Sequence, residues 1–130
     1  MENYFDKVRN YLLELEYTIK TDNAQDQVFV IEKEEDGISN MVIAVADPIV
    51  IMEQTLFTLK RDDPAVLKHL LIKNRDIIHG ALVMDEEGKH VIFRDTLQVE
   101  NLDLNELEAS LNSLSLLMSE FSEYIMKYSA

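Results

Sequence analysis

The side chains in this sequence best suited to chemistry are three histidines, His69, His79 and His90. A zinc site on a helix often places two histidines four residues apart in a His-Glu-x-x-His pattern, and no such pattern occurs here. His79 and His90 could face each other across a hairpin, but a structural zinc ion needs four ligands. We therefore expect surface or edge histidines and no metal site.

Carboxylates are plentiful, but none is placed as catalysis would require. The acidic run at residues 32–36 lacks the Asp-x-Asp-x-Asp-Gly spacing of a calcium loop, and the run at 85–87 is typical of a solvated turn. The five serines between residues 110 and 122 are expected to lie off the apolar stripe of a helix, with no histidine base nearby in sequence. With three glycines and no cysteine, the chain has no phosphate-binding loop and no thiol chemistry. The sequence thus indicates no catalytic residue, no cofactor and no enzyme activity.

The charge balance narrows the class of partner. Against 12 basic residues stand 25 acidic ones, which gives a formal net charge of −13. Nucleic acid and anionic membrane surfaces would be repelled by this charge, whereas a basic protein segment would be attracted. The apolar runs are too short to span a bilayer, and no signal peptide precedes them. We expect a cytoplasmic protein, in keeping with the absence of cysteine.

Periodicity in the first half predicts one helix and then three strands. Apolar residues recur at helical spacing over residues 3–16, and the polar stretch 20–27 is interpreted as a connection. Strands are predicted at 28–33, 39–46 and 49–59, with a turn at Gly37 and a break at Asp47-Pro48. Short connections between successive strands favour an antiparallel meander.

The second half predicts a helix, a hairpin and a long helix. Asp63 and Pro64 form an N-cap and first-turn pair for a helix within residues 61–76. Two apolar runs around the turn at Gly88 predict a hairpin over residues 80–95. Asp103 and Glu106 then form a capping box, and the apolar repeat that follows predicts a helix to about residue 128.

Together these elements predict one domain over residues 1–130, of the α+β class. The expected order is helix, three strands, helix, two strands and helix (α-β-β-β-α-β-β-α), with about five antiparallel strands and helices on one face. The last helix carries more apolar residues than one sheet face needs, including Leu117, Phe121 and Tyr124. Its final turns are expected either to cover a sheet edge or to contact another subunit.

A resemblance to a known family rests on the second half of the chain. The run "LLIKNRDIIHGALVMDEEGKHVIFRDTL" followed by "LDLNELEASLNSLSLLMSEF" resembles the type III secretion chaperone-like superfamily, which includes the Tir-type chaperones and the YbjN family. The shared pattern is a leucine pair, a following asparagine, a glycine that opens a hairpin, an acidic-glycine turn and a long capped helix. The middle of the chain looks more like the YbjN type than like a true secretion chaperone.

The resemblance implies a homodimer that binds protein segments and has no enzyme activity. In the superfamily the second helix and the hairpin after it commonly form the dimer interface. Carried over, this points to Val66, Leu67, Leu70 and Leu71 as interface residues, although packing in the core of one chain would explain the same residues. Our first hypothesis is therefore a dimeric, chaperone-like adaptor that holds an extended or amphipathic client segment.

A small-molecule sensor or regulator of the YbjN type is the alternative. A pocket between the sheet and the helices could hold an apolar ligand near Met41, Met52, Met84 and Met118. Methionine side chains adapt to ligands, but they also fill ordinary cores, so their presence favours neither function strongly.

Overall fold

The computed structural model of the chain describes residues 3–128. Three helices and six strands follow one another as α1 (Tyr4–Glu14), β1 (Thr18–Asn23), β2 (Val28–Lys33), β3 (Ile38–Ala46), β4 (Ile49–Thr58), α2 (Pro64–Lys73), β5 (Ala81–Met84), β6 (His90–Gln98) and α3 (Leu104–Tyr128). The fold is α+β, as predicted. Within the described residues no helix has both the length and the apolar content needed to cross a bilayer.

The six strands form one antiparallel sheet in the order β1-β2-β3-β4-β6-β5. Strands β1 to β4 make the meander that short connections favour. Strand β6 then lies between β4 and β5, so the hairpin of β5 and β6 adds to the sheet through its longer, second strand. The sheet consequently has two edges, β1 and β5.

Strand β1 was not predicted and corrects our expectation of about five strands. Its sequence is TIKTDN, and we interpreted residues 20–23 of it as part of a polar connection. The strand lies at the edge of the sheet, and Ile19, opposite Ile31, is its one apolar side chain. Its register shifts between Ile19 and Thr21. Because most of this strand faces solvent, its residues carry no alternation of apolar and polar side chains by which it could be recognised.

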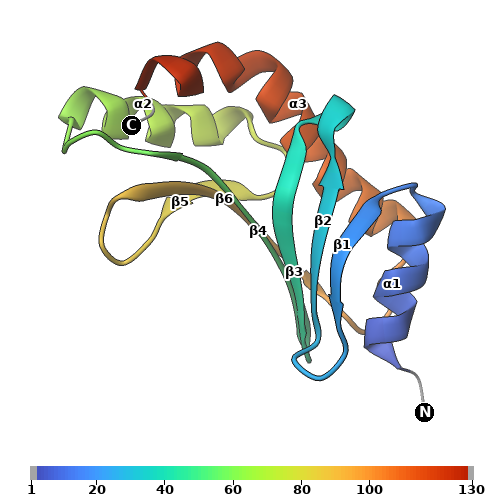
Figure 1. Cartoon of the computed structure of the whole chain (residues 1–130). Coiled ribbons are helices and arrows are strands. Elements are labelled where there is room, and N and C mark those ends of the chain that lie inside the picture. Colours follow the sequence, from blue (N-terminus) through green and yellow to red (C-terminus); the bar gives the residue numbers. More distant parts are fainter. Residues whose placement is uncertain (1–2, 129–130) are drawn as a thin grey trace.

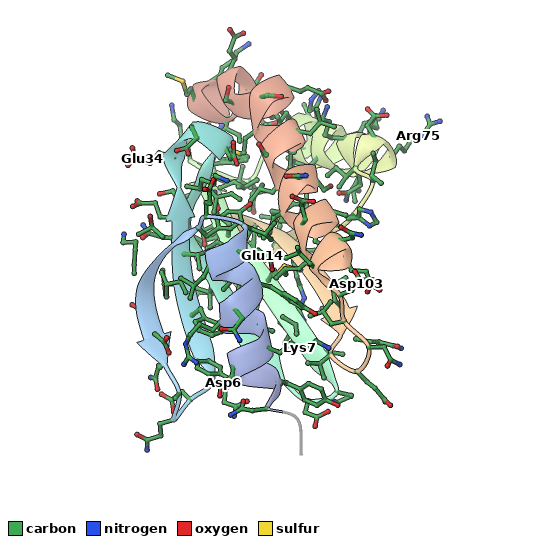
Figure 2. All side chains as sticks on the ribbon, turned by 90° about the vertical axis from the view of Figure 1, so that its right-hand side faces the viewer. Asp6, Lys7, Glu14, Glu34, Arg75 and Asp103 are labelled. Atoms are coloured by element: carbon green, nitrogen blue, oxygen red, sulfur yellow. The ribbon has the colours of Figure 1, made fainter. Side chains whose placement is uncertain are left out.

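All three helices lie on one face of the sheet, as predicted (Figures 1 and 2). Helix α1 is fixed to the first strands by Phe5, whose ring stacks on Phe29 with the centroids 4.1 Å apart. Arg9 in α1 donates a hydrogen bond of 2.6 Å to Asp22 in β1 and lowers the pKa of that carboxyl group. The core lies between this face and the helices, and its largest fully buried side chains are Phe29, Phe93, Leu12, Ile31, Ile38, Met41, Ile43, Met52, Leu102, Leu107, Leu111 and Leu114.

The two predicted helix caps are present. Asp63 accepts hydrogen bonds from the backbone N–H groups of Ala65 and Val66 at the start of α2. Asp103 accepts one from the N–H of Glu106 at the start of α3. These carboxylates satisfy N–H groups that have no partner within the helix, which explains why both helices begin where the sequence indicates.

The C-terminal half of α3 packs against α2, a contact that we did not predict. The ring of Tyr124 stacks on His69 of α2 at 4.2 Å between centroids, and Phe121 stacks on Tyr124 at 4.7 Å. Lys73 of α2 forms an ion pair of 3.2 Å with Glu120. The extra apolar residues of α3 are thus largely used inside one chain, where α2 crosses the end of the long helix (Figure 1).

Candidate partner-binding surfaces

The face of the sheet away from the helices carries a row of apolar side chains that we call the open sheet face. Side chains alternate along a strand, so the neighbours of buried residues point to this second face. Each member is β-branched, and none is buried: Val28, Val30, Val42, Ile49, Ile51 and Ile92. Figure 1 shows no helix on this side of the sheet. Four strands therefore present aliphatic groups that no other element of the chain covers.

Strand register brings these side chains together. Val30 of β2 pairs with Val42 of β3, which pairs with Glu53 of β4, which in turn pairs with Arg94 of β6. Arg94 and Glu53 form an ion pair of 2.6 Å across the two strands. The open sheet face thus combines aliphatic side chains on β2 to β4 with the Glu53–Arg94 ion pair toward β6 and the Lys20–Glu32 ion pair toward β1, a mixture typical of protein-binding surfaces.

A second apolar surface lies between α2 and the hairpin of β5 and β6. It is a groove of about 330 Å³, and we call it the α2 groove. Leu71 on its rim is 71% exposed, and Ile72 beside it is 53% exposed. The apolar side chains that line the groove are Leu67, Leu70 and Leu71 from α2 and Leu82, Val83, Met84 and Val91 from the hairpin. Such exposure of leucine and isoleucine at one place is uncommon on a surface that has no partner.

The residues predicted for an interface divide between the core and the surface. Four of them are buried within the chain at 3 to 5% exposure: Val66, Leu70, Leu117 and Phe121. Leu67 and Tyr124 are partly exposed, and only Leu71 is fully exposed. Any interface on this side therefore depends on Leu67, Leu71 and Tyr124, while the four buried residues hold these three in place.

The histidines do not form a site. His69 stacks on Tyr124. The idea that His79 faces His90 across the hairpin is wrong, because His79 precedes β5 at the opposite end of the hairpin from His90. His90 instead contacts Asp85, with 2.5 Å between its Nδ1 and a carboxylate oxygen. In residues 3–128 no three histidine, aspartate or glutamate side chains are grouped so that they could hold a metal ion.

Two serines of α3 are buried, contrary to our expectation that all five lie off the apolar stripe. The hydroxyl of Ser110 donates a hydrogen bond of 2.6 Å to Asp95. The hydroxyl of Ser113 donates to the carbonyl of His79 at 2.7 Å and accepts from its N–H group at 3.1 Å. These hydrogen bonds join α3 to β6 and to the segment just before β5, so the two serines have a structural role.

The four methionines of the alternative hypothesis do not surround a common cavity. Met41 and Met52 are buried in the core. Met84 lines the α2 groove, whereas Met118 lines a different cavity beside Gly37. Met84 and Met118 therefore line separate cavities, and Met41 and Met52 line neither of these two.

Sequence reasoning missed the open sheet face, although the signal for it was present. Residues 28–31, 41–46 and 49–52 are apolar without interruption, and a strand with only one buried face needs apolar residues only at alternate positions. The surplus apolar residues of these strands could have been interpreted as a second contact surface. We instead expected the additional apolar residues of the last helix to cover a sheet edge or to contact another subunit. Helix α2 covers most of these residues.

Comparison with known proteins gives a family and a fold. The CesT_Tir_1 family model matches residues 1–130. YbjN from E. coli has 13% sequence identity, with 92% of this chain and 91% of that chain covered and a TM-score of 0.66. The HopA1-SchA chaperone–effector complex contains a chain with 14% identity, coverage of 92% and 94%, and a TM-score of 0.65.

The Yersinia pestis type III secretion chaperone SycH was solved in complex with a stable fragment of YscM2. It has 17% sequence identity, with 98% of this chain and 100% of that chain covered and a TM-score of 0.62. No curated protein sequence matches the chain. At these identities the similarity of the structures shows a common fold, and the family model supplies the assignment to a family.

Proposed function

The chain belongs to the CesT/Tir chaperone-like family, and from this premise we propose that it is a non-enzymatic module that holds an extended or amphipathic segment of a client protein. The observation that carries the proposal is the open sheet face. Val28, Val30, Val42, Ile49 and Ile51 expose aliphatic groups over neighbouring strands, and burying such groups against a client releases free energy at about 25 cal/mol per Å².

Two further observations support this function. Structures similar to this chain were solved in complex with an effector and with a protein fragment, so the fold is one that binds protein segments in those cases. The net charge of −13 would steer a basic client segment toward the surface and speed its association.

Copurification from the native cell tests the proposal. Val42→Lys places a charge on the open sheet face, where Val42 is 40% exposed. Leu116→Lys is the matched control, because Leu116 is also apolar and 50% exposed but belongs to α3 on the other side of the sheet. We expect a stoichiometric protein partner that is lost from the first variant and kept by the second, with thermal melts that show both to be folded. Absence of any partner, or its retention by Val42→Lys, would exclude the open sheet face as the client surface.

We also propose that the protein is a homodimer joined through the α2 groove. The support is the exposure of Leu71 and Ile72 next to an apolar groove, together with the use of the second helix for dimerisation in the superfamily that the sequence resembles. Leu70 is buried, so a charge there would unfold the chain and give no information about the interface.

Light scattering on the purified chain tests the dimer. The wild type should have twice the chain mass of 15.1 kDa, and Leu71→Asp should have the mass of one chain. Met126→Asp is a suitable control, because Met126 is 80% exposed but belongs to the last turns of α3. A monomeric wild type, or a dimeric Leu71→Asp variant that melts like the wild type, would contradict this interface.

A further inference from the structure

A cavity at the N-terminal end of α2 is lined by three cations of this acidic protein. Its volume is about 310 Å³. Lys60 and Arg61 reach it from the segment between β4 and α2, and Lys127 reaches it from the last turn of α3. Residues far apart in the sequence therefore bring positive charge to one place. The α2 groove is lined by a different set of α2 residues, so the two cavities are separate.

None of the three cations, Lys60, Arg61 and Lys127, forms an ion pair with another described residue. This is unexpected in a sequence with 25 acidic and 12 basic residues. Asp63 also lines the cavity, held by the N–H groups of Ala65 and Val66, so the lining carries three positive charges against one negative charge.

The remaining wall of the cavity is apolar and held in place. Leu59 and Val66 contribute aliphatic groups, and Tyr128 contributes a ring. The ring of Tyr128 packs on Tyr124, with 4.6 Å between centroids, and Lys127 lies 5.3 Å from the centre of the Tyr128 ring. The N–H of Leu59 donates to the carbonyl of Lys89 at 2.8 Å, which fixes the start of the segment that carries the first two cations.

We propose that this cavity binds a small organic anion that carries an apolar or aromatic group next to its charge. Arg61 and the two lysines would donate charge-assisted hydrogen bonds to a carboxylate or phosphate. Leu59, Val66 and Tyr128 would contact the apolar group. The volume is at the lower end of the roughly 300–1,000 Å³ usual for ligand sites, so the apolar group is no larger than one ring or a short branched chain. No residue that lines this cavity belongs to the open sheet face or lines the α2 groove.

Titrations of the ¹⁵N-labelled chain followed by NMR test the proposal with three probes: phenyl phosphate, inorganic phosphate and benzyl alcohol. Phenyl phosphate should give saturable shifts confined to the amides of residues 59–66 and 124–128. Inorganic phosphate carries only the charge and benzyl alcohol only the ring, so each loses one of the two kinds of contact. Each should therefore bind about tenfold more weakly than phenyl phosphate, a difference of about 1.4 kcal/mol. The negative net charge keeps binding of anions elsewhere on the surface low.

A pair of matched double variants separates this site from a general effect of charge. Lys60→Gln with Arg61→Gln should weaken phenyl phosphate binding about tenfold, the loss expected when two solvent-exposed ion pairs are removed. Lys68→Gln with Arg75→Gln removes the same charge from α2 and from the turn after it, both outside the cavity, and should leave affinity unchanged; Arg75 points away from the molecule (Figure 2). The proposal is overturned if no saturable shift occurs by about 20 mM probe. Equal weakening in both double variants, or equal binding of benzyl alcohol, overturns it as well.

Discussion

At the scale of single residues, Gly37 shows how closely α3 approaches the turn between β2 and β3. Its φ of +76° is in the left-handed region that favours glycine. A Cβ atom added there would lie 2.8 Å from the Cβ of Met118. This contact is too close, and a rotation of the Met118 side chain cannot relieve it, because the helix backbone fixes the position of a Cβ atom. Gln54 completes the contact by donating a hydrogen bond to the carbonyl of Gly37.

Gly37→Ala should therefore destabilise the protein more than Gly88→Ala. Gly88 also has a positive φ, of +70°, but no atom lies within 4 Å of its added Cβ. The backbone strain of about 1 kcal/mol is common to both variants, and overpacking should add about 1–3 kcal/mol for Gly37→Ala alone. Urea unfolding measures the difference in free energy. Equal losses in the two variants would mean that α3 does not approach Gly37 as described.

At the scale of elements, the hairpin of β5 and β6 is closed by one carboxylate. Asp85 accepts hydrogen bonds from the N–H groups of Lys89, at 2.8 Å, and of His90, at 3.1 Å. It also contacts the ring of His90. These interactions, the contact with the His90 ring first, lower the pKa of Asp85 to about 2. A lowered pKa means that the ionised carboxylate stabilises the fold, and that this contribution is lost as the pH falls from about 4 to about 2.

Asp85→Asn should lower the melting temperature above about pH 4, and the difference from the wild type should shrink as the pH approaches 2. The amide keeps some hydrogen bonds but has no charge to lose. Glu86→Gln removes a neighbouring exposed carboxylate and should melt like the wild type throughout. Melting curves followed by circular dichroism give the comparison. A difference between Asp85→Asn and wild type that stays constant from about pH 5 to 2 would show that the charge of Asp85 has no role.

Elements with strong local signals could be predicted, and those defined by distant contacts could not. Asp63 and Asp103 cap helices through groups within three residues, so sequence reveals them. The edge strand β1 depends on β2 for its position and has no pattern of its own. The packing of Tyr124 on His69 joins residues 55 positions apart (124 − 69), and nothing local distinguishes it from an interface contact. For the same reason the predicted interface included Leu117 and Phe121, which are core residues.

At the scale of the whole molecule, the net charge opposes the association between chains that two apolar surfaces would promote. The open sheet face and the α2 groove would both promote association between chains. The net charge of −13 opposes it, because chains of equal charge repel one another. The isoelectric point is about 4.5, so this repulsion disappears under mild acid.

Turbidity measured against pH should therefore have its maximum near pH 4.5. At that pH no charge repulsion keeps the apolar surfaces of different chains apart, while most carboxylates are still ionised and the chain is still folded. Return to pH 7 should clear the solution, because the chains associate as folded molecules. A maximum well below the isoelectric point, or turbidity that does not reverse, would indicate that unfolding causes the association.

The two edges of the sheet differ in a way that limits how chains can join. Strand β1 is polar and has a register shift, and both features hinder the addition of another strand. Strand β5 has four residues and lies beside the α2 groove. Edge-to-edge growth of a fibre would need a receptive edge on both sides of every molecule. The polar, bulged β1 edge works against such growth, so pairing through β5 would end at a closed pair of chains.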